Sequence, residues 1–148
     1  MKKIILALAV IFTLQITTAF AVNDNKVSQE VLNAFKSEFT TAKEVQWTTG
    51  NNFYRADFVF NGQHVFAYYS LDGNMMGVTR FVELAQLPFQ LQTSLKKNYA
   101  DYWMSELFEV ASSENSGYFI TLENASQKVI LKSADKTNWT VYKKTNKI

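Results

Sequence analysis

Residues 53–82, FYRADFVFNGQHVFAYYSLDGNMMGVTRFV, decide the fold of this chain. Two dipeptides, Asn61-Gly62 and Asp72-Gly73, interrupt runs of aromatic and β-branched residues. A two-residue type I′ hairpin loop needs positive φ at both of its positions, and Asn, Asp and Gly adopt that conformation at low cost. The stretch therefore predicts three antiparallel strands, over residues 53–60, 63–71 and 74–82.

These loops set a pairing register in which one face of the hairpins is apolar. The first loop places Phe58 opposite Val65 and Tyr54 opposite Tyr69, and the second places Met76 opposite Tyr69. Side chains alternate between the two faces of a strand, so these residues lie on one side of the sheet. We expect a helix to cover this side.

The opposite face is mixed, although a solvent-facing side of an antiparallel sheet is normally polar. Its aromatic side chains are either covered by another part of the chain or available to a ligand, and both explanations stay open here. The members of this face are Phe53, Arg55, Asp57, Val59, His64, Phe66, Tyr68, Met75, Thr79 and Phe81.

Two helices and five further strands complete the expected secondary structure. Residues 27–39 have apolar residues at helical spacing with Ser28 as N-cap, and a second helix opens at Leu87-Pro88, where proline suits the first turn. The further strands are predicted at about 44–49, 103–111, 118–123, 128–133 and 139–144.

The two halves of the chain, about 27–83 and 87–144, follow one pattern of a helix and then four strands. The helices match at an offset of 60 residues, and the strands after the first inter-strand turn match at an offset of 64, because that turn is longer in the second half. We therefore predict an α+β fold made of a tandem repeat of helix plus four-stranded antiparallel sheet, with up to eight strands and the two helices packed on one face.

Residues 1–21 have the pattern of a secretory signal peptide. Lys2 and Lys3 precede an apolar run that ends in small residues, with cleavage expected after Ala21. The run is shorter than the roughly 20 residues of a membrane span, and no later stretch approaches that length. We expect one domain over residues 22–148, without a membrane span after signal cleavage, in the periplasm or secreted.

Net charge and cysteine content exclude several classes of partner and of chemistry. Two of the 15 basic residues and none of the 13 acidic ones lie in the leader, so the rest of the chain is formally neutral. Broad electrostatic binding to nucleic acid or to an anionic membrane is disfavoured. The sequence contains no cysteine, which excludes disulfides, thiol catalysis, cysteine-bound zinc and a lipid anchor on cysteine.

The candidates for chemistry are few. His64, the sole histidine, is expected diagonal to Asp57, a possible acid–base pair, but no nucleophile motif accompanies them. The carboxylates Asp57, Asp72, Glu83 and Asp101 are dispersed, so no metal site is expected. No glycine-rich phosphate loop is present, and no cofactor is expected.

The last third of the chain is rich in lysine, with Phe119, Trp139 and Tyr142 nearby. Single-stranded nucleic acids bind to such combinations. A solvated sheet edge, where lysines deter aggregation, is the preferred interpretation, and no nucleic-acid partner is expected. The lysines are Lys128, Lys132, Lys136, Lys143, Lys144 and Lys147.

Several motifs together resemble the exported PepSY-like, beta-lactamase-inhibitor-like proteins of Bacteroidetes-type bacteria. The family has the same order of helix, V-x-W strand, Y-x-A-x-F strand, N-G turn, aromatic strand, D-G turn and L-P helix start. The matching segments are Val31-Leu-Asn-Ala-Phe35, Phe39, Ala42 to Trp47, Tyr54 to Phe58, Asn61-Gly62, Ala67-Tyr-Tyr69, Asp72-Gly73 and Leu87-Pro88. Thr40 departs from the proline that relatives often have.

The resemblance implies a small periplasmic or secreted module with no known enzymatic activity and no catalytic residue to carry over. Our leading hypothesis is a non-catalytic exported binding module that recognises a protein, peptide or envelope component. One alternative is an inhibitor of a secreted hydrolase or protease, and another is a small enzyme using His64 and Asp57. The expected contacts are Phe53, Arg55, His64, Phe66, Tyr68 and Phe81, types enriched at interface hot spots.

Overall fold

The computed structural model describes residues 26–147, so the predicted leader at 1–21 lies outside the described residues. The helices are α2 (Gln29–Glu38), the 3₁₀ helix η2 (Leu84–Gln86) and α3 (Phe89–Asn98). The strands are β1 (Lys43–Thr49), β2 (Phe53–Phe60), β3 (Gln63–Ser70), β4 (Met75–Phe81), β5 (Trp103–Ala111), β6 (Gly117–Glu123), β7 (Gln127–Ser133) and β8 (Thr140–Asn146).

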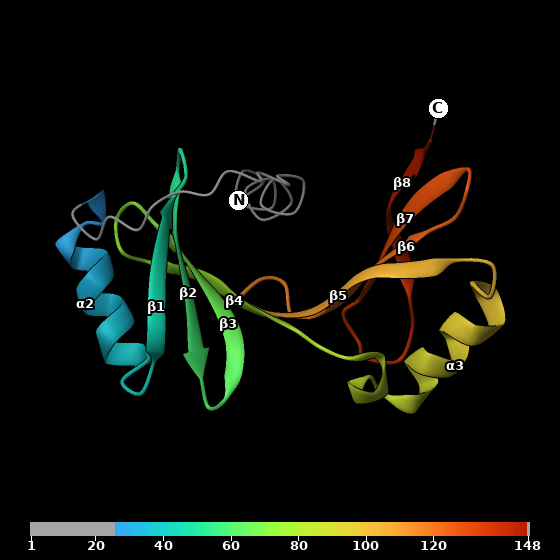
Figure 1. Cartoon of the computed structure of the whole chain (residues 1–148), viewed down its shortest axis with the longest axis horizontal. Coiled ribbons are helices and arrows are strands. Elements are labelled where there is room, and N and C mark those ends of the chain that lie inside the picture. The colour runs from blue at the N-terminus through green and yellow to red at the C-terminus, as the bar shows by residue number, and fades with distance from the viewer. Residues whose placement is uncertain (1–25, 148) are drawn as a thin grey trace.

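All eight strands form one antiparallel sheet in chain order, from β1 to β8. The first half of the sheet, β1–β4, is joined to the second, β5–β8, by the register from Val78 opposite Ala111 to Phe81 opposite Phe108. Figure 1 shows β4 and β5 crossing between two groups of elements, with α2 at one end and α3 at the other. The predicted α+β class with eight strands and two α-helices is confirmed.

Both α-helices pack on the same face of the sheet. Ala67 belongs to the core under α2, and it lies opposite Val78, which in turn lies opposite Ala111. Leu107, four residues before Ala111 on β5, shares that face and packs into the core under α3. Each half therefore has its own core on one common side, and the other side carries no helix among residues 26–147.

α2 begins after its predicted N-cap, whereas α3 begins at Phe89, with Pro88 as its N-cap rather than in its first turn. Ser28 is the N-cap of α2, where its Oγ accepts a hydrogen bond from the Val31 N–H at 3.4 Å. Val31 and Phe35 are the buried residues of α2, and Leu91 and Leu95 those of α3. No helix within residues 26–147 is both long enough and apolar enough to cross a membrane.

The first hairpin turn has the expected conformation. Asn61 has a φ of 51° and Gly62 a φ of 78°. Positive φ at both loop positions is what a type I′ turn requires. The register that follows from this turn, with Phe58 opposite Val65, is the predicted one.

The second hairpin turn differs from its prediction. Ser70 ends β3 and Met75 begins β4, and the Gly73 N–H donates to the Ser70 carbonyl at 3.1 Å. Within the described residues of this loop, positive φ occurs at Gly73 alone. A two-residue type I′ turn is thus not formed, and a bulge places Met75, rather than Met76, opposite Tyr69.

Candidate binding face

The six side chains predicted to form a site all lie on the face of the sheet opposite α2 and α3, which we call the helix-free face. On β2 and β3 they alternate with residues of the core under α2. Cross-strand partners confirm the common side, because Arg55 lies opposite Tyr68 and Phe81 lies opposite Phe108. The predicted set is therefore brought to one surface by the pleat of three strands.

Aromatic rings and one guanidinium group form a cluster on this face. The rings of Phe66 and Phe81 meet edge to face with centroids 5.6 Å apart. The guanidinium carbon of Arg55 lies 5.5 Å from the centroid of the Phe66 ring, within cation–π range. The Phe53 and Tyr68 rings lie 6.0 Å apart. The cluster is thus an aromatic surface with a positive charge on it.

Members of the cluster differ in what they offer to a partner. Phe81 is 60% exposed, whereas Tyr68 is only 7% exposed. Burial raises the pKa of the Tyr68 hydroxyl, and the Arg55 charge and side-chain hydrogen bonding with Thr79 offset part of that rise. Tyr68 therefore stays protonated and supports the cluster from below, while Phe81 can be contacted directly.

Arg55 keeps one hydrogen-bond donor unused. Its Nη2 donates to the Thr48 Oγ1 at 3.4 Å. Its Nε is buried and has no hydrogen-bond partner among residues 26–147. An unpaired buried N–H costs about 1–3 kcal/mol, so this nitrogen is a locally unfavourable feature of the cluster.

His64 and Asp57 lie near each other at the rim of the face. His64 Nδ1 lies 3.8 Å from Asp57 Oδ1, and the two side chains are 71% and 36% exposed. Proton transfer in catalysis needs a pocket that fixes donor and acceptor, and this pair is solvated. In the described part of the chain no three His, Cys, Asp or Glu side chains are grouped to hold a metal ion.

The helix-free face continues into the second half of the chain, which the sequence analysis did not predict. The Phe108 and Phe119 rings stack 5.5 Å apart with 7° between their planes, and Tyr142 meets Phe119 edge to face. Lys132 places its ammonium group 5.5 Å from the Phe119 ring centroid. Alternation along the predicted strands 103–111 and 118–123 indicates which residues share a face within that half, but no short turn determines how that half pairs with strand 74–82.

Phe81 joins the two aromatic groups because it lies opposite Phe108 across the β4–β5 boundary. An aromatic row therefore runs across both halves of the sheet, with an arginine in one half and a lysine in the other. Phe108 and Phe119 are buried, with 7% and 4% exposure, so they support the row from within, and Phe81 and Tyr142 are its exposed members. The row contains Phe66, Phe81, Phe108, Phe119 and Tyr142.

Several lysines of the second half are engaged within the chain. Lys147 lies 2.9 Å from Glu123 and Lys128 lies 3.8 Å from it, and these lysines lower the pKa of the Glu123 carboxyl, mainly through the hydrogen bond with Lys147. Lys136 lies 3.8 Å from Glu109. The charges of these three lysines are thus partly neutralised by neighbouring carboxylates.

Similar folds occur in solved structures from Bacteroides. A BLIP-like protein from Bacteroides fragilis matches with a TM-score of 0.69 and 16% identity, over 80% of this chain and 85% of that chain. A candidate periplasmic protein from Bacteroides eggerthii matches with a TM-score of 0.70 and 19% identity, over 81% and 88%. A DUF2874 family protein from Bacteroides uniformis matches with a TM-score of 0.70 and 17% identity, over 80% and 88%.

At these identities the likeness concerns the fold. No protein-family model matches the sequence. No curated protein matches it either. The chain is thus similar in architecture to BLIP-like and DUF2874 proteins, and its function has to be argued from its own residues.

Proposed function

We propose that this protein is a non-catalytic exported binding module that recognises a protein, peptide or cell-envelope component through the helix-free face. The contacts are Phe53, Arg55, His64, Phe66 and Phe81, with Tyr68 supporting them. The cluster of Arg55, Phe66 and the 60% exposed Phe81 on a sheet face without a helix is the observation that carries the proposal. Aromatic residues and arginine are enriched where binding energy concentrates.

The extent of the row favours a macromolecular ligand over a small molecule. Small molecules bind in concave pockets that enclose most of their surface. Here Phe81, 60% exposed, stands on a sheet surface between two aromatic groups. A partner that lies across the sheet could contact Phe81 in the first half and Tyr142, 42% exposed, in the second.

Export and repeat architecture belong to the same proposal. Cleavage after Ala21 would deliver residues 22–148 to the periplasm or the medium. The proposed tandem copies, 27–83 and 87–144, would each contribute part of the binding face. The PepSY-like resemblance of the motifs and the BLIP-like fold both agree with such a module.

Inhibition of a secreted hydrolase or protease is the second candidate function. The specific observation in its favour is the likeness to the BLIP-like protein from Bacteroides fragilis. Catalysis by His64 and Asp57 is not supported, because both side chains are solvated and lie 3.8 Å apart. Titrating a panel of secreted hydrolases and proteases with the purified protein would separate inhibition from passive binding.

The test compares two exposed phenylalanines. Phe81→Asp places a charge in the centre of the aromatic row, and Phe89→Asp places the same charge on α3, where Phe89 is 81% exposed. Residues 22–148, tagged and immobilised, would capture partners from envelope extract. We expect Phe81→Asp to lose the captured partner and Phe89→Asp to keep it.

Unfolding curves of both variants would show that each remains folded. Equal capture by wild type and Phe81→Asp would contradict the proposal. Tyr142→Ala then tests the extension of the face, since Tyr142 is 42% exposed at the far end of the row.

A further inference from the structure

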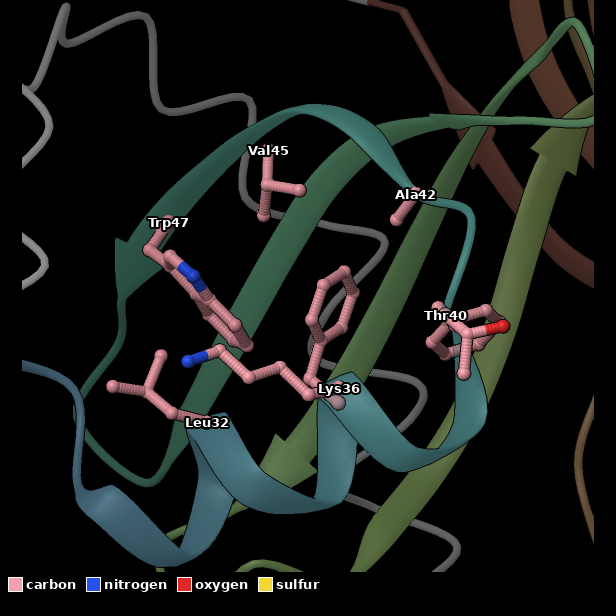
Figure 2. Close-up of a pocket in the computed structure, with 8 residues that line it drawn as sticks. Leu32, Lys36, Thr40, Ala42, Val45 and Trp47 are labelled. Atoms are coloured by element: carbon pink, nitrogen blue, oxygen red, sulfur yellow. The ribbon is translucent and has the colours of Figure 1, made fainter.

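A groove lies between α2 and β1, on the opposite side of the sheet from the helix-free face. Its volume is about 510 Å³. Figure 2 shows the side chains of Leu32, Val45 and Trp47 around it, with Lys36 extending from α2 across the opening. The lining residues are Leu32, Phe35, Lys36, Phe39, Thr40, Ala42, Val45 and Trp47.

The groove adjoins a free sheet edge. β1 is the first strand of the sheet and pairs with β2 alone among the described strands. The Gly50 N–H donates to the Phe53 carbonyl at 2.8 Å, toward β2. Backbone groups alternate in direction along an antiparallel strand, so the N–H and C=O groups of Thr49 and Trp47 point away from β2. A further strand could pair with them.

In the second half of the molecule the edge that corresponds to that of β1 is already paired with another segment of the chain. β5, the counterpart of β1, has neighbours on both sides, β4 and β6. The Val82 N–H, just beyond β4, donates to the Leu107 carbonyl at 3.2 Å. Val82 is buried in the core with Leu107 and Leu91 of α3. An extended segment with a β-branched side chain thus fills the space between helix and strand there.

Leu107 in the second half corresponds to Trp47 in the first, because both lie before the first inter-strand turn, where the offset between the halves is 60 residues. We infer that the free edge of β1 and its groove form a second binding site, which takes an extended peptide of a partner as an added antiparallel strand. The peptide places an apolar side chain beside Trp47 and Leu32. Main-chain hydrogen bonds supply affinity and the groove supplies selectivity, as in other strand additions.

The positive charge of Lys36 in the groove indicates that the peptide carries a carboxylate. Lys36 is the ionisable residue of the lining, is exposed, and makes no ion pair within 4.0 Å among residues 26–147. A carboxylate on the peptide, two residues from the apolar side chain and on the same face, would meet it. The partner is therefore an extended segment with an apolar residue and a nearby carboxylate.

The other edge of the sheet is unsuited to this role. β8 is exposed along its whole length and carries Lys143 and Lys144. Lysines on an edge strand oppose the addition of further strands. The outward-facing part of β1, from Trp47 to Thr49, carries no charge. The asymmetry directs strand addition to β1.

The experiment uses an acetylated, amidated hexapeptide, Thr-Thr-Phe-Val-Thr-Glu, and residues 22–148 labelled with ¹⁵N. The peptide keeps the Phe-Val pair of residues 81–82 and adds a carboxylate two positions after the valine. We expect chemical-shift changes confined to α2 and β1 and slowed hydrogen exchange of the Trp47 and Thr49 amides. Replacing the peptide's Glu by Gln should weaken binding.

Three variants test the geometry. Thr49→Pro removes an outward N–H and should weaken binding about tenfold, since it deletes one backbone hydrogen bond and obstructs pairing. Lys36→Gln should weaken it about two- to fivefold, as expected for a partly solvated ion pair. Lys96→Gln, the matched position on α3, should leave affinity unchanged.

Three outcomes would overturn the inference. One is a set of shift changes on the helix-free face instead of β1, and another is an equal loss from Lys36→Gln and Lys96→Gln. The third is the absence of shift changes in α2 and β1 when the peptide is added. Phe81→Asp should bind the peptide like wild type, so this site can fail or succeed independently of the helix-free face.

Discussion

The two halves of the molecule build the same architecture from different side chains. In the first half, one cross-strand row of the core reads Trp47, Ala56 and Ala67 over β1, β2 and β3. In the second half, the matching row reads Leu107, Ile120 and Leu131 over β5, β6 and β7. The first half thus fills this row with one large ring and two alanines, and the second half fills it with three medium-sized aliphatic side chains.

The same contrast holds across both cores. The core under α2 contains Phe35, Trp47, Phe58 and Tyr69, in ring contacts such as the 4.9 Å edge-to-face pair of Phe35 and Phe58. The core under α3 is mostly leucine, isoleucine and valine. Protein interiors are close-packed, so filled volume and the apolar pattern have to be kept, while residue identity does not. This explains why the halves match in pattern with little identity.

The largest expected effect comes from emptying matched positions of the two cores. Phe58 is fully buried, and its counterpart at the strand offset of 64 residues is Leu122, 4% exposed. Phe58→Ala should lower the free energy of unfolding by about 3–5 kcal/mol, and Leu122→Ala by about 2–5 kcal/mol. Urea unfolding followed by circular dichroism measures both.

Phe89→Ala is the control, because a side chain 81% exposed should change stability by less than about 0.5 kcal/mol. A loss below about 1 kcal/mol for Phe58→Ala would show that the ring contacts of the first half do not form a close-packed core. That result would break the equivalence of the two cores.

A smaller effect is expected from transplanting one core residue. Ala67→Leu introduces the residue that stands at the matched position 131, but beside Trp47 and Ala56 it overfills the row. The cost should be about 1–3 kcal/mol in unfolding free energy. Adding Trp47→Leu makes room, so the double variant should lose less than the sum of the two single variants.

A double-mutant cycle from urea unfolding measures this coupling. Strict additivity of the two changes would contradict volume compensation along the row. Leu91→Ala in the other core provides a pairing control, since it is distant from Ala67 and should combine additively with Ala67→Leu.

Much of the fold could be predicted because the sequence specifies it locally. The Asn61-Gly62 turn determines the register of β2 on β3 through positive φ at two residues, and the structure has this register. For the Asp72-Gly73 turn the predicted register was wrong by one residue, because Met75 rather than Met76 lies opposite Tyr69. Its sequence fits both a two-residue loop and a longer one with a bulge, and the choice depends on packing beyond the loop.

The candidate face was predicted in its first half and missed in its second. Phe66 and Phe81 could be placed because the turns supplied a register. Phe108 and Phe119 could not be placed beside them, because the pairing of β4 with β5 joins residues that no short turn connects. The groove by α2 was also beyond prediction, since it depends on which edge of the sheet stays free.

The turns provide another contrast between the halves, because the first half uses glycines where the second uses side-chain acceptors. Gly62 has a φ of 78°, and a Cβ added there would meet nothing within 4 Å. Gly62→Ala should therefore cost about 1–2 kcal/mol of unfolding free energy from backbone conformation alone. Thermal unfolding measures it, and Ala125→Gly, in a turn of the second half, should change stability by less. An unchanged stability of Gly62→Ala would show that the first-half turn does not depend on its glycine.

In the second half, Asp135 holds the β7–β8 turn with its carboxylate. Its Oδ1 accepts hydrogen bonds at 2.8 Å from the backbone N–H groups of Thr137 and Asn138. Asn124 does the same in the β6–β7 turn, where its Oδ1 accepts from the N–H groups of Ser126 and Gln127. One turn therefore uses a titratable acceptor and the other an amide, in similar geometry.

The smallest predicted effect is a pH dependence confined to the Asp135 turn. The backbone hydrogen bonds from Asn138 and Thr137 hold the pKa of the Asp135 carboxyl well below its usual range. A folded pKa below the unfolded value of about 3.9 means that the stabilisation is present above that pH and is lost as the pH falls toward the folded pKa.

Asp135→Asn keeps an acceptor, as Asn124 does, but cannot titrate. The difference in unfolding free energy between wild type and Asp135→Asn should thus be constant near neutral pH and change below about pH 4. Urea unfolding between pH 2.5 and 7, in roughly half-unit steps across that window, measures it, and a difference that stays constant through the acid range would show that the carboxylate charge adds nothing to the turn.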